Sequence, residues 1–318
     1  LETIVRQSCF SINGDILLFM TYISDNVNIP RLLLEQTVSY VSEWNEFDIS
    51  HNSIKYLKSI PTKKLTSPKE NEKDEEIREQ AIAEEDHDAP IETLDIYDYD
   101  ETKIDELNNQ LIRAFLQLKI IARNFSAFIS ILPAPAKKDY VLAIYQLPNK
   151  IFNQWSESID NSIDGLVEEI ITWQEDPSFE GKKLSREDIL RFFQNISLDM
   201  LLNLYYLVSS YGANENTVDY LAQQDYIPQS TNYRIERMMF LEKVDDYQAV
   251  IRESETLYDK HDSGITNNLV LAILRHMLIH SDKISDREKR RISSAYFSPP
   301  VQTKILMDRQ KAKKENGI

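Results

Sequence analysis

Residues 101–132, ETKIDELNNQLIRAFLQLKIIARNFSAFISIL, decide the fold class that this sequence predicts. Their apolar residues recur at steps of three and four, the spacing that places them on one face of a helix. The row consists of Ile104, Leu107, Leu111, Phe115, Leu118, Ala122, Phe125 and Ile129. A second row, Ile112, Leu116 and Ile120, widens this face. We expect a helix that is buried on more than one side and that Pro133 ends.

The rest of the chain repeats this helical pattern. Only six glycines occur among 318 residues, which favours long helices over tight turns. Ser185 and Ser285 each precede an acidic residue by three positions, which is the spacing of a helix-starting capping box. Pro148 is expected to kink or divide the helical stretch 139–175, and Leu198–Tyr211 is expected to form a further helix. The predicted fold is all-α, a bundle of antiparallel amphipathic helices joined by short loops.

The sequence divides into four predicted parts. Residues 1–60 form a small helical module, which is too short for a strong core of its own and should lean on a later domain or a partner. Residues 61–100 form an acidic linker, residues 101–298 the main helical domain, and residues 299–318 a basic C-terminal helix or tail.

Charge is distributed unevenly along the chain. The net charge is −16, and Lys69–Glu106 contributes 17 acidic against 4 basic residues. Lys283–Lys314 has the opposite balance, with 10 basic against 3 acidic residues. Dense like charge with little apolar content is typical of a solvated linker. The alternative is an acidic arm that docks on a basic surface, either the chain's own C-terminal region or a site for nucleic acid, and that holds the protein inhibited.

Several functional classes are excluded by missing motifs. The six glycines are too scattered to form a phosphate-binding loop, and no nucleophile elbow occurs. Asp98 and Asp100 lack the glycine and the distal glutamate of a calcium loop. The single cysteine, Cys9, permits no internal disulfide and suits a reducing compartment. No uninterrupted apolar run approaches the ~18 residues of a membrane span. We therefore expect a cytoplasmic protein without a cofactor, metal or membrane contact.

One apolar helix carries three polar residues that call for an explanation. Ile265–Asp282 reads ITNNLVLAILRHMLIHSD and contains Arg275, His276 and His280. The two histidines are spaced as metal ligands on one helical face would be, but no HExxH glutamate lies between them. Polar groups in an apolar setting need partners, so the structural explanation bonds Arg275 and His280 to carboxylates such as Asp282 or Glu255.

Arg275, its polar follower His276, and His280 also form an arginine–x4–histidine motif that resembles the signature of HEPN domains. This resemblance is limited to residues 185–297 and implies a helical, metal-independent endoribonuclease in which two such motifs meet across a dimer interface. A histidine would activate the ribose 2′-OH, and an arginine would stabilise charge on the phosphorane. Five residues of helix separate Arg275 from His280 by about 140°, which favours a site composed of two protomers.

A basic run follows this helix. Arg287, Lys289, Arg290 and Arg291 precede Tyr296 and Phe297, and alternating basic and aromatic residues are typical of single-strand binders. A solvated helix face, or a contact for an acidic partner, is the other interpretation.

Two functions remain after these exclusions. The preferred one is a non-catalytic, all-helical interaction or regulatory subunit that works within a larger protein assembly, as a homodimer or with protein partners. The alternative is a HEPN-type endoribonuclease, a toxin or defence effector that uses Arg275 and His280 and has RNA as its substrate.

Overall fold

The computed structural model describes residues 28–58, 106–176, 183–259 and 264–315, together with Phe179 and Gly181. Every element formed by these residues is a helix, so the all-α prediction is confirmed. The predicted acidic linker, residues 61–100, lies outside the described part of the chain, as do residues 1–27.

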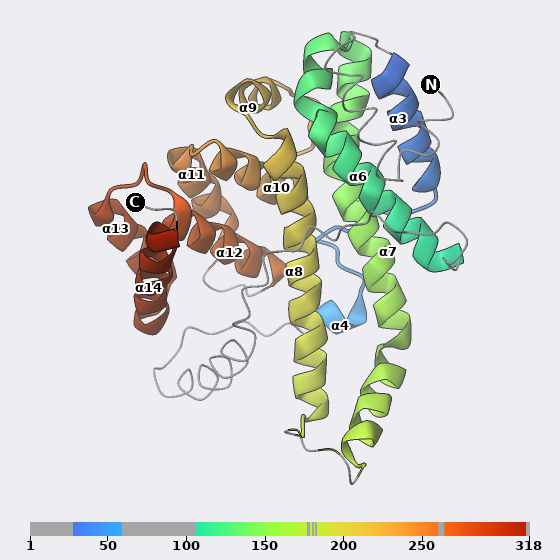
Figure 1. Cartoon of the computed structure of the whole chain (residues 1–318), viewed down its shortest axis with the longest axis vertical. Helices are drawn as coiled ribbons and strands as arrows, with labels where there is room; N and C mark the ends of the chain where they lie inside the picture. The colour runs from blue at the N-terminus through green and yellow to red at the C-terminus, as the bar shows by residue number, and fades with distance from the viewer. Residues whose placement is uncertain are drawn as a thin grey trace.

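Three long helices form the centre of the molecule (Figure 1). They are α6 (Glu106–Ile131), α7 (Ala134–Gln174) and α8 (Arg186–Gly212). Each packs against the other two, and Leu118, Phe125 and Phe128 of α6 are fully buried between them. The apolar periodicity of residues 101–132 therefore predicted the core helix correctly.

Neither predicted division of a long helix occurs. Pro148 lies inside α7, which continues across it as one helix because its neighbours Leu147 and Ile151 are buried in the core. Packing at this position offsets the roughly 3 kcal/mol that an internal proline costs a helix. Leu198–Tyr211 is likewise the second half of α8, whose capping box at Ser185 and Asp188 matches the prediction.

The N-terminal helices pack on this centre. Both α3 (Asn28–Tyr40) and α4 (Lys55–Lys58) contact α7; α3 also contacts α6, and α4 also contacts α8. Within the described residues, the N-terminal module therefore has no separate core, as its short length suggested.

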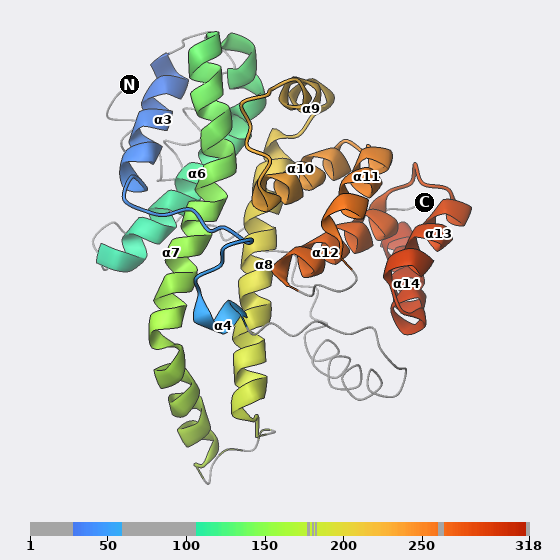
Figure 2. The ribbon, with the colours of Figure 1, turned by 180° about the vertical axis from the view of Figure 1, so that it is seen from behind.

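The C-terminal half forms a second group of helices beside α8 (Figure 2). It comprises α10 (Thr231–Lys243), α11 (Tyr247–Leu257), α12 (Ile265–His280), α13 (Asp286–Tyr296) and α14 (Pro299–Glu315). The short α9 (Glu215–Ala222) contacts α6. α10 joins the two groups because it packs against both α8 and α12.

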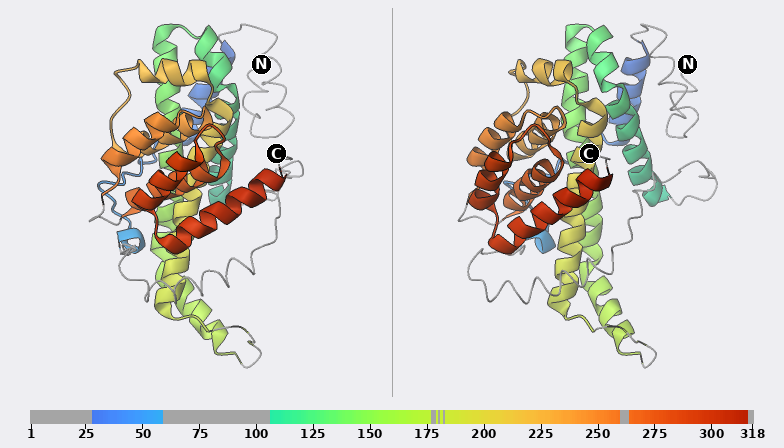
Figure 3. Two further views of the ribbon diagram at one scale, coloured as in Figure 1. Left: turned by 90° about the vertical axis from the view of Figure 1, so that its left-hand side faces the viewer. Right: turned by 60° about the vertical axis from the view of Figure 1, so that its left-hand side comes forward.

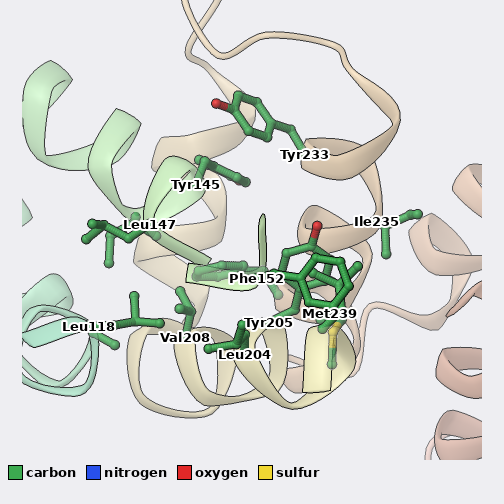
Figure 4. Packing of buried hydrophobic residues seen from close by; sticks show 14 of the residues in the cluster. Leu118, Tyr145, Leu147, Phe152, Leu204, Tyr205, Val208, Tyr233, Ile235 and Met239 are labelled. Atoms are coloured by element: carbon green, nitrogen blue, oxygen red, sulfur yellow. The ribbon is translucent and has the colours of Figure 1, made fainter. Parts of the chain in front are cut away.

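Tyrosines and asparagines from three helices meet inside the core. In Figure 4, Tyr145 of α7 and Tyr233 of α10 lie next to each other; their rings are tilted by 39°, and the ring centroids are 5.2 Å apart. Tyr205 of α8 donates a hydrogen bond to Asn149 of α7 at 2.6 Å, and the Asn232 amide donates to the same oxygen at 2.7 Å. This buried polar network ties α7, α8 and α10 together.

Candidate functional site

The polar residues of α12 lie at the margins of a buried helix. Leu269, Ile273 and Met277 form its buried face, which packs toward α8, α10, α11 and α14. His276 is partly buried, whereas His280 is exposed at the C-terminal end. The apolar sequence around these residues favours burial, yet Arg275 and His276 are only partly buried and His280 is exposed, because the side chains emerge beside the apolar face.

Arg275 is held by the C-terminal helix. Its Nη2 atom donates to Oδ2 of Asp308 on α14 at 2.7 Å, and about a third of each side chain is exposed. The carboxylate partner expected for the arginine thus exists, but it is Asp308 rather than Asp282 or Glu255. This ion pair joins α12 to α14, which lies across the outside of the second helix group (Figure 3).

His276 faces α10 instead. Its Nδ1 atom lies 2.8 Å from Oε1 of Glu242, whose side chain is only 9% exposed. The edge of its ring meets the Tyr206 ring of α8 at a centroid distance of 5.7 Å. His276 therefore connects three helices at one point.

His280 is placed beside its neighbour. The His276 and His280 ring centroids are 4.4 Å apart. Partial desolvation and the nearby His276 ring lower the pKa of His280 below its usual value of 6.5. Lys243 adds positive charge in the same region and donates to the Tyr206 hydroxyl at 2.8 Å. His280 is therefore uncharged at neutral pH and able to accept a proton.

The structure does not bring Arg275 and His280 together. Arg275 pairs with α14, whereas His280 contacts His276 on the side of α10, as the helical angle between them predicted. No group of three histidine, cysteine or acidic side chains suited to a metal ion occurs in the described part of the chain.

The basic run on α13 is not a single surface. Lys289 is only 5% exposed and donates to the carbonyl oxygen of Ser281. Burial, reinforced by the nearby Arg309, lowers the pKa of Lys289 to about 8. Arg287, Arg290 and Arg291 are exposed, and Arg291 lies 3.9 Å from Glu288. Lys289 is therefore a helix-joining residue, and the accessible basic surface on α13 is limited to the three arginines.

A second candidate site was missed by the sequence reasoning. The C-terminal end of α7 and the N-terminal end of α8 project beyond the other helices as an antiparallel pair (Figures 1 and 3). Residues 159–174 of α7 and residues 186–199 of α8 are here called the arm. Trp173, near the end of α7, is 63% exposed. On α8, Phe192 is 53% exposed, and Ile196, one turn further along, is exposed as well. Their helical spacing looked like core periodicity in the sequence, so only the three-dimensional arrangement reveals that this face is bare.

Comparisons with protein families, curated proteins and solved structures found no match for the chain. One described window, Gln110–Ile131 of α6, is long and apolar enough to cross a membrane by length and composition. More than half of that window is buried inside the protein, where it forms the centre of the core. Such burial is what the core helix of a bundle shows.

Proposed function

We propose that this protein is a non-catalytic interaction or regulatory subunit, and that the arm is the surface through which it contacts a protein partner. The observation that carries this proposal is the exposure of Trp173, Phe192 and Ile196 on one projecting hairpin. Clustered, exposed large apolar side chains mark interaction surfaces in soluble proteins. Aromatic residues also supply much of the binding energy where two proteins meet.

The arrangement around α12 supports the same proposal. Arg275 and His276 are engaged in contacts with Asp308 and Glu242 of neighbouring helices. Such contacts hold helices in register, and they leave the arginine of the motif bound within its own chain.

The arm can be tested by quantitative affinity capture with the full-length chain. The double variant Phe192→Ser/Ile196→Ser removes exposed apolar groups, and Val38→Ser removes one from the distant helix α3. We expect specific proteins captured by the unaltered chain to be lost with the double variant and retained with the control. An identical set of captured proteins for all three chains would refute a role for the arm.

A metal-independent endoribonuclease of the HEPN type is the second candidate. The observation in its favour is the exposed His280, whose lowered pKa makes it a proton acceptor near neutral pH. Since Arg275 of the same chain is turned toward Asp308, the arginine of a second copy would have to complete this site.

The nuclease candidate has its own assay. Single-stranded RNA is incubated with the protein in EDTA, beside Arg275→Ala, His280→Ala and the matched exposed controls Arg31→Ala and His51→Ala. Cleavage that disappears in the first two variants alone would establish the nuclease. Intact RNA with the folded native protein, over a concentration range that includes any dimer, would leave the interaction proposal standing alone.

A further inference from the structure

The two sides of the arm differ. On one side, Arg186 binds Asp164 at 2.5 Å and Glu168 at 2.6 Å. α4 covers the same side, where the Tyr56 backbone amide donates to Asp160 at 3.1 Å and Gln194 donates to the Tyr56 carbonyl at 2.7 Å. This side is therefore closed by polar contacts.

The opposite side carries two apolar rows. Leu166, Ile170 and Trp173 follow one another at steps of four and three on α7, and Phe192, Ile196 and Met200 follow at steps of four on α8. Residues at these steps share a helix face, and the phase of the two antiparallel helices places both rows on the side away from α4. Leu166, Ile170 and Met200 are partly buried, whereas Trp173, Phe192 and Ile196 are exposed. The two rows are here called the seam. Trp173, Phe192 and Ile196 of the seam are exposed, and the ring of Phe179 packs edge-to-face with Trp173 at a centroid distance of 4.8 Å.

The arm as a whole is negatively charged in sequence. Residues 160–199 contain ten acidic and four basic residues. Two of the basic residues, Arg186 and Arg191, are already paired with carboxylates of the arm itself. Glu169 precedes Trp173 by one helical turn, is exposed and has no ion-pair partner among the described residues. An exposed carboxylate therefore lies one turn from Trp173, on an arm whose sequence is negative overall.

We infer that the arm binds a basic amphipathic helix of a partner protein. A helix laid along the seam would bury its own apolar row against Trp173, Phe192 and Ile196 and complete a three-helix bundle. Lysine or arginine residues beside that row would meet Glu169 and the other carboxylates. A second copy of this chain is disfavoured as the occupant, because two arms would bring together surfaces of the same negative charge. This inference rests on the proposed interaction function of the arm.

The test measures the binding of two matched peptides to the full-length protein by fluorescence anisotropy. One is a helical leucine–lysine peptide of about 16 residues, with leucines at helical spacing; the other has glutamate in place of each lysine. We expect the lysine peptide to bind and the glutamate peptide not to bind. Binding should weaken about tenfold in Phe192→Ser/Ile196→Ser, as for the central residues of an interface. It should be unchanged in Val38→Ser.

A charge reversal tests the complementarity directly. Glu169→Lys should weaken the binding of the lysine peptide several-fold and allow the glutamate peptide to bind. Glu215→Lys on α9 should leave the binding of both peptides unchanged. The acidic run Lys69–Glu106 will also attract lysine peptides. Only the part of the measured binding that changes in the arm variants is therefore assigned to the arm. Circular dichroism of each variant checks that the helices remain intact.

The outcomes separate this inference from the function on which it rests. Equal binding of both peptides through the arm, or self-association in ultracentrifugation that Phe192→Ser/Ile196→Ser abolishes, would overturn the basic-helix inference and keep the arm as an interaction surface. If the arm variants change neither peptide binding nor affinity capture, the inference and the proposed function are both overturned.

Discussion

The Asn232 side-chain amide lies 2.7 Å from Oδ1 of Asn149, fully enclosed between α10 and α7. The same amide nitrogen also donates to the Phe47 carbonyl at 3.0 Å, and its oxygen accepts from the Ile49 backbone at 2.9 Å. One side chain therefore attaches the loop between α3 and α4 to the core. Because this site is buried, water cannot replace any bond that is lost.

Asn232→Ala should destabilise the protein by about 2–5 kcal/mol, because several buried donors and acceptors lose their partner at once. Urea denaturation followed by circular dichroism measures this change. The control is Asn203→Ala at an exposed position of α8, which should change stability by less than about 0.5 kcal/mol. Equal effects of the two substitutions would show that the network contributes little.

Glu236 makes the stability depend on pH. Its side chain is 0% exposed, neither carboxylate oxygen has a hydrogen-bond partner among the described residues, and burial, followed by the charge of Glu46, raises its pKa well above 4.5. The folded state therefore keeps a proton that the unfolded state releases. The stability that this difference provides is complete below pH 4.5 and is lost as the pH rises through the folded-state pKa.

Glu236→Gln removes this titration. Relative to the unaltered protein, the variant should gain up to about 1.4 kcal/mol for each pH unit between the unfolded and folded pKa values. Urea denaturation at several pH values above 4.5 measures the gain. A stability difference that stays constant with pH would contradict the raised pKa, and Glu215→Gln on the surface is the matched control.

Arg275 and Asp308 should contribute modestly to the position of α14. Since both side chains are about one-third exposed, a double-mutant cycle with Arg275→Ala and Asp308→Ala should give a coupling of about 0.5–1 kcal/mol. Hydrogen exchange should quicken along α14 in either single variant. A coupling of zero with unchanged exchange would show that packing alone holds this helix.

His280 should titrate below the usual histidine pKa of 6.5, because desolvation and the His276 ring disfavour its charged form. Its contribution to stability is present above pH 6.5 and is lost as the pH falls through the lowered folded-state pKa. NMR titration of the imidazole signals measures this value directly, and His276→Gln should move it upward. An unchanged His280 pKa in that variant would exclude coupling between the two rings.

Helix positions could be predicted from the sequence because they follow from local patterns. The capping residues Ser185 and Ser285, and the apolar spacing in residues 101–132, act within one or two turns of chain. Pro148 does not divide α7, because tertiary packing decides whether a helix continues across an internal proline. Local sequence rules therefore predict that a segment is helical better than they predict whether two helical segments join into one helix.

The candidate sites depend on partners that are distant in the sequence. Asp308 lies 33 residues from Arg275, and Glu242 lies 34 residues from His276, so the choice between many carboxylates is made only by the packing of α10, α12 and α14. Lys289 was predicted to belong to a basic binding or solvated surface, yet its side chain turns inward to the Ser281 carbonyl. Exposed and buried apolar helix faces have the same spacing in the sequence. The exposure of Trp173 and Phe192 could therefore not be predicted from the sequence.

The length of α7 has a mechanical consequence. Its 41 residues span about 60 Å, and its last turns extend past Asp160, where the backbone of α4 is bonded to it. A rod fixed at one end behaves as a lever, so a small tilt where it is clamped becomes a much larger excursion at Trp173. Labels near Trp173 and on α6 would register that swing as a change in separation.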